Sequence, residues 1–217
     1  LVSANEWAGA LKPDFFAPFI LGIGAFIITF SNKQKMTQKA EIAVGFGILF
    51  IGLSSMSSSI GVYQDSPVFY KAFQVLGGNP ILGIFVGAVV TAIIQSSSAS
   101  VGILQTLAMR GIVNWRSAIF ITLGQNIGTC ITAILSSAGA NKTAKRAAVI
   151  HLSFNVLGAA IYGVIMTIFF GIFPDLAMQH ISSTQISIFH SIFNISVTIL
   201  LFPFANALVK LSGLIIR

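Results

Sequence analysis

Long apolar stretches, separated by short polar segments, run through this chain of 217 residues. About 20 apolar residues are enough for a helix to cross the hydrocarbon core of a bilayer. The pattern predicts full membrane spans at 15–32, 42–60, 147–173 and 187–209. Only 8% of the residues are charged, against about 25% in an average soluble domain, and the mean hydropathy is +0.92. We therefore expect an all-α polytopic membrane protein forming a single transmembrane domain.

One uncharged stretch does not fit a simple span. Residues 72–109 are 38 residues without a formal charge, too long for one crossing and too short for two crossings with a loop. Asn79-Pro80 is a helix-start signal within it, and Gln95-Ser96-Ser97-Ser98 interrupts the apolar run. The pattern predicts a re-entrant hairpin at 80–109, with half-helices at 80–94 and 99–109 and a turn at 95–98.

A second polar interruption lies in the uncharged run 117–138. Its sequence, Gly124-Gln125-Asn126-Ile127-Gly128-Thr129, places two glycines around a Gln-Asn pair. Such a segment is typical of an unwound point, because glycine weakens a helix. We expect a broken transmembrane helix here. Elsewhere, the pairs Gly22/Gly24 and Gly45/Gly47 indicate close helix packing.

The basic residues favour the hairpin over a full crossing. If the 33–39 loop is cytoplasmic, the hairpin leaves eight basic residues inside and four outside, whereas a full crossing at 80–109 leaves five against seven. The eight are Lys33, Lys35, Lys39, Lys142, Lys145, Arg146, Lys210 and Arg217, and the four are Lys12, Lys71, Arg110 and Arg116. The expected location is the inner (cytoplasmic) membrane, with the N-terminus of the chain outside and its C-terminus cytoplasmic. The net charge of +7 follows this pattern and does not indicate a nucleic-acid partner.

Helix ends inside a membrane can bind ions. The start of a half-helix offers N–H donors and the end of the preceding one offers carbonyls, so transporters use them for anions and cations respectively. Neither break contains Lys or Arg, so a bound anion would depend on helix starts, serine hydroxyls and a co-bound cation. The alternative is that the serines only kink a helix or bond back to its carbonyls.

The two motifs resemble those of a known family. Gln95-Ser96-Ser97-Ser98 resembles the QSSS signature of the type II sodium–phosphate cotransporters and their bacterial relatives, and Asn126-Ile127-Gly128-Thr129 resembles the element that follows it there. Residues 83–158 are similar to one complete repeat core, most like the second repeat of bacterial members. The resemblance implies sodium-driven phosphate uptake by two inverted-topology repeats. It implies phosphate binding by Gln95, Ser96, Ser97, Ser98, Asn126, Gly128 and Thr129, and sodium binding by Gln95, Ser96, Ser98, Thr129 and Thr132.

Only one QSSS motif is present, and the chain begins with Leu1 rather than Met. We therefore expect one inverted-repeat half of a secondary transporter. The other repeat would come from a missing N-terminal half or from a second copy. The expected ligands are inorganic phosphate, Na⁺ as the one metal ion, and membrane lipid, without an organic cofactor.

Other functions remain open from the residues alone. A non-transporting membrane scaffold or assembly subunit fits a half-length chain, and hydroxyl-rich sites do not separate phosphate from arsenate or sulfate. An intramembrane serine hydrolase would need a base such as His151 or His190, but no acidic residue lies in the predicted spans, so we expect no enzyme. The pattern His151-x-x-x-Asn155 recurs as His190-x-x-x-Asn194, and each pair shares a helix face. Hydrogen bonds between two neighbouring helices are the first interpretation, and a substrate or proton role is the second.

Overall fold

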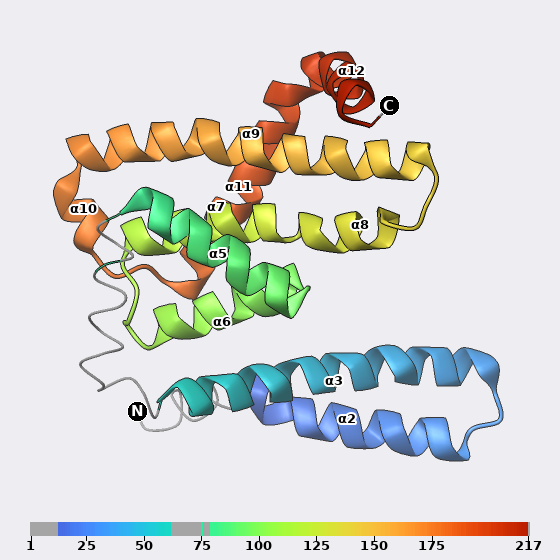
Figure 1. The fold of residues 1–217 in the computed structure, drawn as a ribbon. Coiled ribbons are helices and arrows are strands. Elements are labelled where there is room, and N and C mark those ends of the chain that lie inside the picture. Colours follow the sequence, from blue (N-terminus) through green and yellow to red (C-terminus); the bar gives the residue numbers. More distant parts are fainter. Residues whose placement is uncertain (1–12, 62–74, 76–78, 217) are drawn as a thin grey trace. The chain divides into compact units, whose positions relative to one another are not determined.

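The computed structural model describes residues 13–61, 75 and 79–216. It divides into two compact units, Leu1–Val62 and Tyr63–Arg217. The described part is almost entirely helical, as expected for an all-α membrane protein (Figure 1).

The described residues of the first unit form an antiparallel pair of helices, α2 (Pro13–Phe30) and α3 (Gln34–Gly61) (Figure 1). A Cβ added at Gly24 would lie 3.0 Å from the Ala40 carbonyl oxygen, and one at Gly47 would lie 2.9 Å from the Ala17 carbonyl oxygen. These two glycines therefore let the helix backbones approach closely. Among the described residues, nothing lies within 4 Å of such a Cβ at Gly22 or Gly45, so no described helix packs closely on these two glycines, contrary to expectation.

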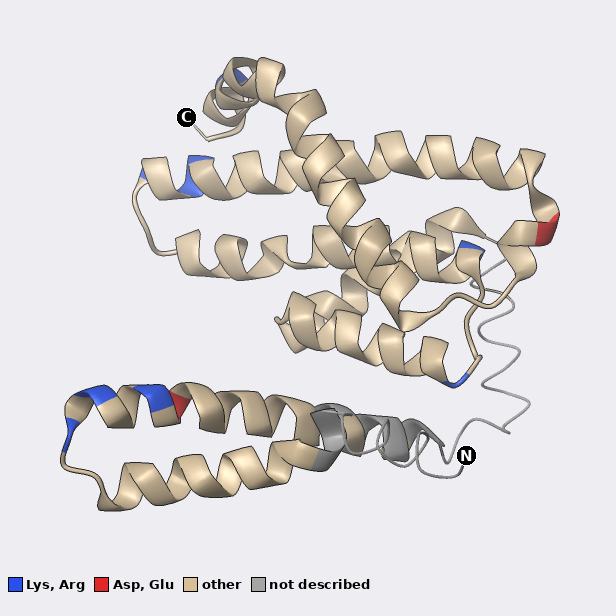
Figure 2. Cartoon of the chain, turned by 180° about the vertical axis from the view of Figure 1, so that it is seen from behind, with Lys and Arg blue, Asp and Glu red and all other residues tan. Residues whose placement is uncertain are grey.

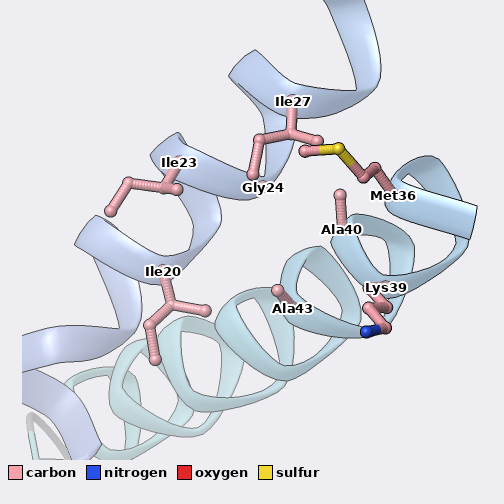
Figure 3. A pocket seen from close by; sticks show the side chains of 8 residues that line it. All are labelled: Ile20, Ile23, Gly24, Ile27, Met36, Lys39, Ala40 and Ala43. Atoms are coloured by element: carbon pink, nitrogen blue, oxygen red, sulfur yellow. The ribbon is translucent and has the colours of Figure 1, made fainter. Parts of the chain in front are cut away.

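A groove of about 290 Å³ lies between α2 and α3 (Figure 3). Its lining is apolar except for one lysine, and consists of Ile20, Ile23, Gly24, Ile27, Met36, Lys39, Ala40 and Ala43.

In the second unit, the described residues from Asn79 onward form first a helical hairpin. Helix α5 (Pro80–Ile94) starts at Asn79, whose side chain accepts hydrogen bonds from the amides of Ile81 and Leu82 at 3.0 and 3.2 Å. Pro80 at the first helical position suits this start, because its missing N–H would have no partner there. Helix α6 (Ser97–Met109) returns antiparallel to α5 (Figure 1).

Helices α7 (Trp115–Gly128) and α8 (Cys130–Ser137) lie end to end, and α9 (Lys142–Ile172) runs alongside both (Figure 1). A short α10 (Pro174–Met178) and α11 (Ser183–Leu201) follow, and the 3₁₀ turn Phe202–Phe204 leads into α12 (Ala205–Ile215). The predicted span 187–209 is therefore not one uninterrupted helix. Pro203 lies in the turn that interrupts it, because proline cannot donate the next helical hydrogen bond.

Within the described part of the chain, three helical stretches are long and apolar enough to cross a membrane, namely Trp115–Ser137, Lys142–Ile172 and Ser183–Ile215. Phe16–Phe30 and Pro80–Ile94 are shorter apolar helices. The predicted spans at 147–173 and 187–209 fall mainly on long stretches, 15–32 overlaps a shorter one, and 42–60 lies within α3. Membrane crossing by each segment stays a prediction.

Basic residues of the second unit gather at the α8–α9 end (Figure 2). Lys142, Lys145 and Arg146 lie at the start of α9, and Arg146 Nε donates to the Ile216 carbonyl at 3.1 Å, which holds the end of α12 nearby. Arg116 lies in the first turn of α7, at the opposite end, where the Trp115 amide donates to the Gln179 carbonyl at 3.0 Å.

Candidate functional site

The hairpin breaks at Gln95, which adopts a left-handed conformation with φ 58° and ψ 20°. Among the described residues it is the one non-glycine residue with positive φ. Its amide still donates to the Thr91 carbonyl at 2.7 Å, which closes α5. Ser96 then caps α6, accepting a hydrogen bond at 3.3 Å from the Ala99 amide. The first half-helix ends where predicted, and the second starts at Ser97 rather than at residue 99.

The start of α6 carries donors suited to an anion. The amides of Ser97 and Ser98 occupy the first turn, where a helix supplies no carbonyl partner. Ser98 and Gln95 are exposed, and Ser96 and Ser97 are partly exposed. This turn therefore combines accessible hydroxyls with the positive end of a helix dipole.

Helix α5 packs directly on α7 through three glycines. A Cβ added at Gly87 would lie 2.1 Å from the Ile121 carbonyl oxygen, one at Gly124 would lie 1.9 Å from the Ile84 carbonyl oxygen, and one at Gly128 would lie 2.4 Å from that of Ala88. No side chain fits at such distances, so the backbones touch.

The expected interruption of this span lies at Thr129, between α7 and α8, and it is slighter than the predicted unwinding over Gly124–Thr129. Gly124 to Gly128 belong to α7, and the single residue between α7 and α8, Thr129, has helical angles of φ −59° and ψ −25°. Its amide donates to the Gln125 carbonyl at 3.1 Å, so the helix continues almost without a break. The glycines serve contact with α5 instead.

A buried polar network joins the two arms of the hairpin to α7. The hydroxyls of Thr91 in α5 and Ser100 in α6 lie 2.7 Å apart. Gln125 Nε2 donates to the Ser100 carbonyl at 2.9 Å and to Ser100 Oγ at 3.0 Å. All three residues are at most 2% exposed. Gln125 Oε1 is also buried and accepts no hydrogen bond from the described residues.

These three residues were not among the predicted site residues. Gln125 lies inside the motif, but Thr91 and Ser100 flank the break by one helical turn on either side. The sequence feature that could have identified Thr91 and Ser100 is that both carry a hydroxyl group within an apolar run and lie at similar distances from the break at 95–98.

The other predicted residues lie in α7 and α8. Asn126 is 6% exposed, and its Nδ2 donates to the Thr122 carbonyl at 2.9 Å. The Thr129 hydroxyl donates to the carbonyls of Gln125 at 3.2 Å and Asn126 at 2.5 Å. The Thr132 hydroxyl donates to the Thr129 carbonyl at 3.0 Å. Gly128 packs on α5, so the structure brings the Gly124–Thr129 motif against the hairpin.

The repeated His-x-x-x-Asn patterns do not bond to each other. Asn155 Nδ2 donates to the His151 carbonyl at 3.0 Å, and Asn194 Nδ2 donates to the His190 carbonyl at 2.8 Å. Each asparagine therefore bonds within its own helix, which corrects the expected pairing between the two helices. The His190 ring instead reaches Asn126, 3.3 Å away.

We expect Thr91→Val to weaken the hairpin measurably. Valine keeps the shape but removes the hydroxyl that meets Ser100, which costs about 0.5–1.5 kcal/mol for a buried hydrogen bond, or about 0.6 kcal/mol on average between membrane helices. Unfolding of the full-length protein in mixed micelles measures this loss. Thr167→Val is the matched control, because the exposed Thr167 bonds only to the Gly163 carbonyl of its own helix. Equal losses in both variants would contradict a role for the network.

The amino-acid sequence of the chain is similar to a known protein family and to several known proteins. The model of the Na⁺/Pi-cotransporter family matches residues 2–58 and 66–193. "Uncharacterized protein YqeW" of Bacillus subtilis (strain 168) is 30% identical over 95% of this chain and 66% of its own length. "Putative inorganic phosphate export protein YjbB" of Salmonella typhimurium is 23% identical over 94% of this chain and 37% of its own length. "Sodium-dependent phosphate transport protein 2A" of Rattus norvegicus is 32% identical over 59% of this chain and 22% of its own length.

The chain thus spans from about two thirds to less than a quarter of the length of these relatives. No solved structure matches. The family model covers both motifs, the hairpin and the helices that hold it, and the chain belongs to the Na⁺/Pi-cotransporter family.

Proposed function

We propose that this chain supplies one repeat of a sodium-coupled phosphate symporter of the cytoplasmic membrane, working in the direction of import. The observation that supports the proposal is the left-handed break at Gln95, after which α6 starts within the three serines and Ser100, one turn further on, accepts hydrogen bonds from Gln125 of the Gly124–Thr129 motif. Family membership supports phosphate as the anion. The chain acts by binding and conformational change, without an enzymatic step.

Phosphate would bind at the start of α6. The amides of Ser97 and Ser98 and the hydroxyls of Ser96 to Ser98 are donors to an oxyanion there, together with the Gln95 carboxamide. Asn126, Gly128 and Thr129 complete the proposed anion site from α7. Because no Lys or Arg belongs to this set, a bound cation would balance part of the phosphate charge.

Sodium would bind to oxygens at the break of the hairpin and around the junction of α7 and α8. Gln125 Oε1, buried without a donor among the described residues, fits a cation, because such an oxygen is costly unless something pairs with it. Thr129 and Thr132 donate to carbonyls, which leaves their hydroxyl lone pairs free to accept. Together with Gln95, Ser96 and Ser98 they form the proposed sodium-binding set.

The second repeat would come from the rest of a longer protein or from a second copy of this chain, since transporter sites of this kind lie between repeats. The basic α8–α9 end would face the cytoplasm, with the N-terminus of the chain outside and the C-terminus inside.

The test is sodium-driven phosphate uptake by the full-length protein in proteoliposomes. An inward sodium gradient should drive accumulation of radiolabelled phosphate, and an equal potassium gradient should not.

Ser97→Ala should reduce this uptake at least about tenfold, the loss expected when a hydrogen bond to a charged group is removed. Asn126→Ala should abolish uptake, and neither variant should lose membrane expression.

The control is Ser136→Ala, because Ser136 is an exposed serine of α8. Phosphate uptake of the same size with and without a sodium gradient would contradict the proposed coupling of phosphate to sodium. Wild-type uptake in Ser97→Ala would contradict the site, and sodium-driven efflux from loaded vesicles without uptake would reverse the proposed direction.

A further inference from the structure

The buried Asn126 side chain has two hydrogen-bonding partners, the backbone carbonyl of Thr122 and the imidazole ring of His190. The Thr122 carbonyl can only accept, so the Asn126 NH₂ group must face it, and this pair is 2.9 Å apart. Oδ1 of the same carboxamide then faces Nε2 of His190 at 3.3 Å. Because Oδ1 can only accept, Nε2 must carry the proton. A neutral His190 ring is therefore the Nε2–H tautomer, with Nδ1 unprotonated.

Helix α11 holds His190 in this position from both sides. Near its start, Gln105 Nε2 of α6 donates to Ser187 Oγ at 2.6 Å and to the Ser183 carbonyl at 3.3 Å. One turn beyond the ring, the buried Phe193 lies close to Gly158 of α9, within 3.5 Å of an added Cβ. These contacts fix α11 beside α6 and α9, so the backbone of His190 is held where its ring reaches Asn126.

We infer that His190 is a positioning residue of the transport site, which fixes the orientation of the Asn126 carboxamide through its Nε2–H group. This inference deepens the proposed function and rests on it. One hydrogen of the Asn126 NH₂ group is used by Thr122, and the other stays available to an oxyanion. Without the histidine donor, Oδ1 is left buried and unpaired, and rotation of the carboxamide becomes a way to relieve that cost.

The repeated sequence pattern supplies a matched control. His151 begins the same His-x-x-x-Asn pattern in α9, and Asn155 donates to its carbonyl just as Asn194 does to that of His190. The His151 side chain is exposed, however, whereas the His190 side chain is partly buried against Asn126. Substitutions at the two histidines therefore separate the ring contact from the local helix pattern.

The first measurement is the tautomer itself. The full-length protein is labelled with ¹⁵N-histidine, placed in bilayers, and studied by solid-state NMR at a pH where the rings are neutral. The variants His151→Gln and His180→Gln each remove one histidine signal, and this assigns the histidine signals of this chain. His190 should show a protonated Nε2 and a bare Nδ1. Asn126→Leu, which removes the acceptor, should move the His190 Nε2 signal and leave that of His151 unchanged. A protonated Nδ1, or a Nε2 signal indifferent to Asn126→Leu, would overturn the inference.

The second measurement is transport. His190→Leu should raise the phosphate KM at least about tenfold, the cost of misplacing one donor to a charged ligand, with a smaller change in maximal rate. His190→Gln, whose amide N–H can donate to Asn126, should recover most of the affinity, and His151→Leu should behave as wild type. Equal loss in His190→Leu and His190→Gln at wild-type protein yield would indicate a merely structural ring and overturn the inference. Absence of sodium-driven phosphate uptake by the wild type would refute the proposed function, while the NMR result would still decide whether His190 holds Asn126.

Discussion

Gly124→Ala is expected to destabilise the second unit by about 3 kcal/mol or more, at the upper end of the cost of overpacking a core. The new Cβ would lie 1.9 Å from the Ile84 carbonyl oxygen and 2.8 Å from the Ala88 amide nitrogen. Both are backbone atoms of α5, so no side-chain rotation relieves the clash and the two helices must separate. Ser100 of α6 bonds both to Thr91 of α5 and to Gln125 of α7, so separation of α5 from α7 also strains this buried network.

Gly171→Ala makes the same chemical change in open space. Gly171 lies in α9 with nothing within 4 Å of an added Cβ, so alanine should stabilise the helix by up to about 1 kcal/mol. The two variants should therefore shift the unfolding midpoint of the full-length protein in opposite directions. Detergent-solubilised yield and thermal unfolding followed by size-exclusion chromatography measure both. Similar midpoints for the two alanine variants would show that α5 and α7 are not in backbone contact.

The two helices of the hairpin were predictable because their signals are local, whereas a re-entrant course in the membrane stays a prediction. Asn79 and Pro80 start a helix by capping and by fixed backbone geometry, and the polar run at 95–98 interrupts an apolar stretch. These signals act within a few residues, so the sequence pattern predicted the end of α5 at residue 94 correctly. The start of α6 was predicted two residues late, because Ser96 was assigned to the turn although it also caps the helix.

The motif alone did not indicate whether Gly124 and Gly128 interrupt their helix or allow another helix to approach it. Glycine weakens a helix, and it also permits another helix to approach. Which property matters depends on the partner surface, here Ile84 and Ala88 of α5, about 40 residues away in the chain. The broken-helix prediction rests on the first property. The structure interrupts the helix only slightly, at Thr129, and uses the second property at Gly124 and Gly128.

The buried contacts of the site depend on tertiary geometry in the same way. Ser100 and Gln125 are 25 residues apart, and Asn126 and His190 are 64 residues apart. The sequence showed that His190 and Asn194 share a helix face, and it gave no indication that Asn126 would be the partner of the ring. Contacts of this kind follow from helix packing, which residue spacing does not specify.

Gln95→Gly should make the protein more stable and less active. A non-glycine residue in the left-handed region costs about 1–2 kcal/mol, and glycine at such a helix end avoids this cost. The exposed Gln95 side chain has little packing to lose, so the free energy of unfolding should rise by about 1 kcal/mol. Sodium-driven phosphate uptake should nevertheless fall at least about tenfold, because the substitution removes a carboxamide of both proposed ion sites.

Gln95→Asn separates the two effects. Asparagine tolerates the left-handed conformation better than most residues and keeps a carboxamide, so it should preserve stability and part of the uptake. Gln95→Val should lower stability, since a β-branched side chain is strongly disfavoured at φ 58°. Strained residues persist where their side chains serve a function. A Gln95→Gly variant that is both more stable and fully active would mean that the strain at this break serves no function in transport.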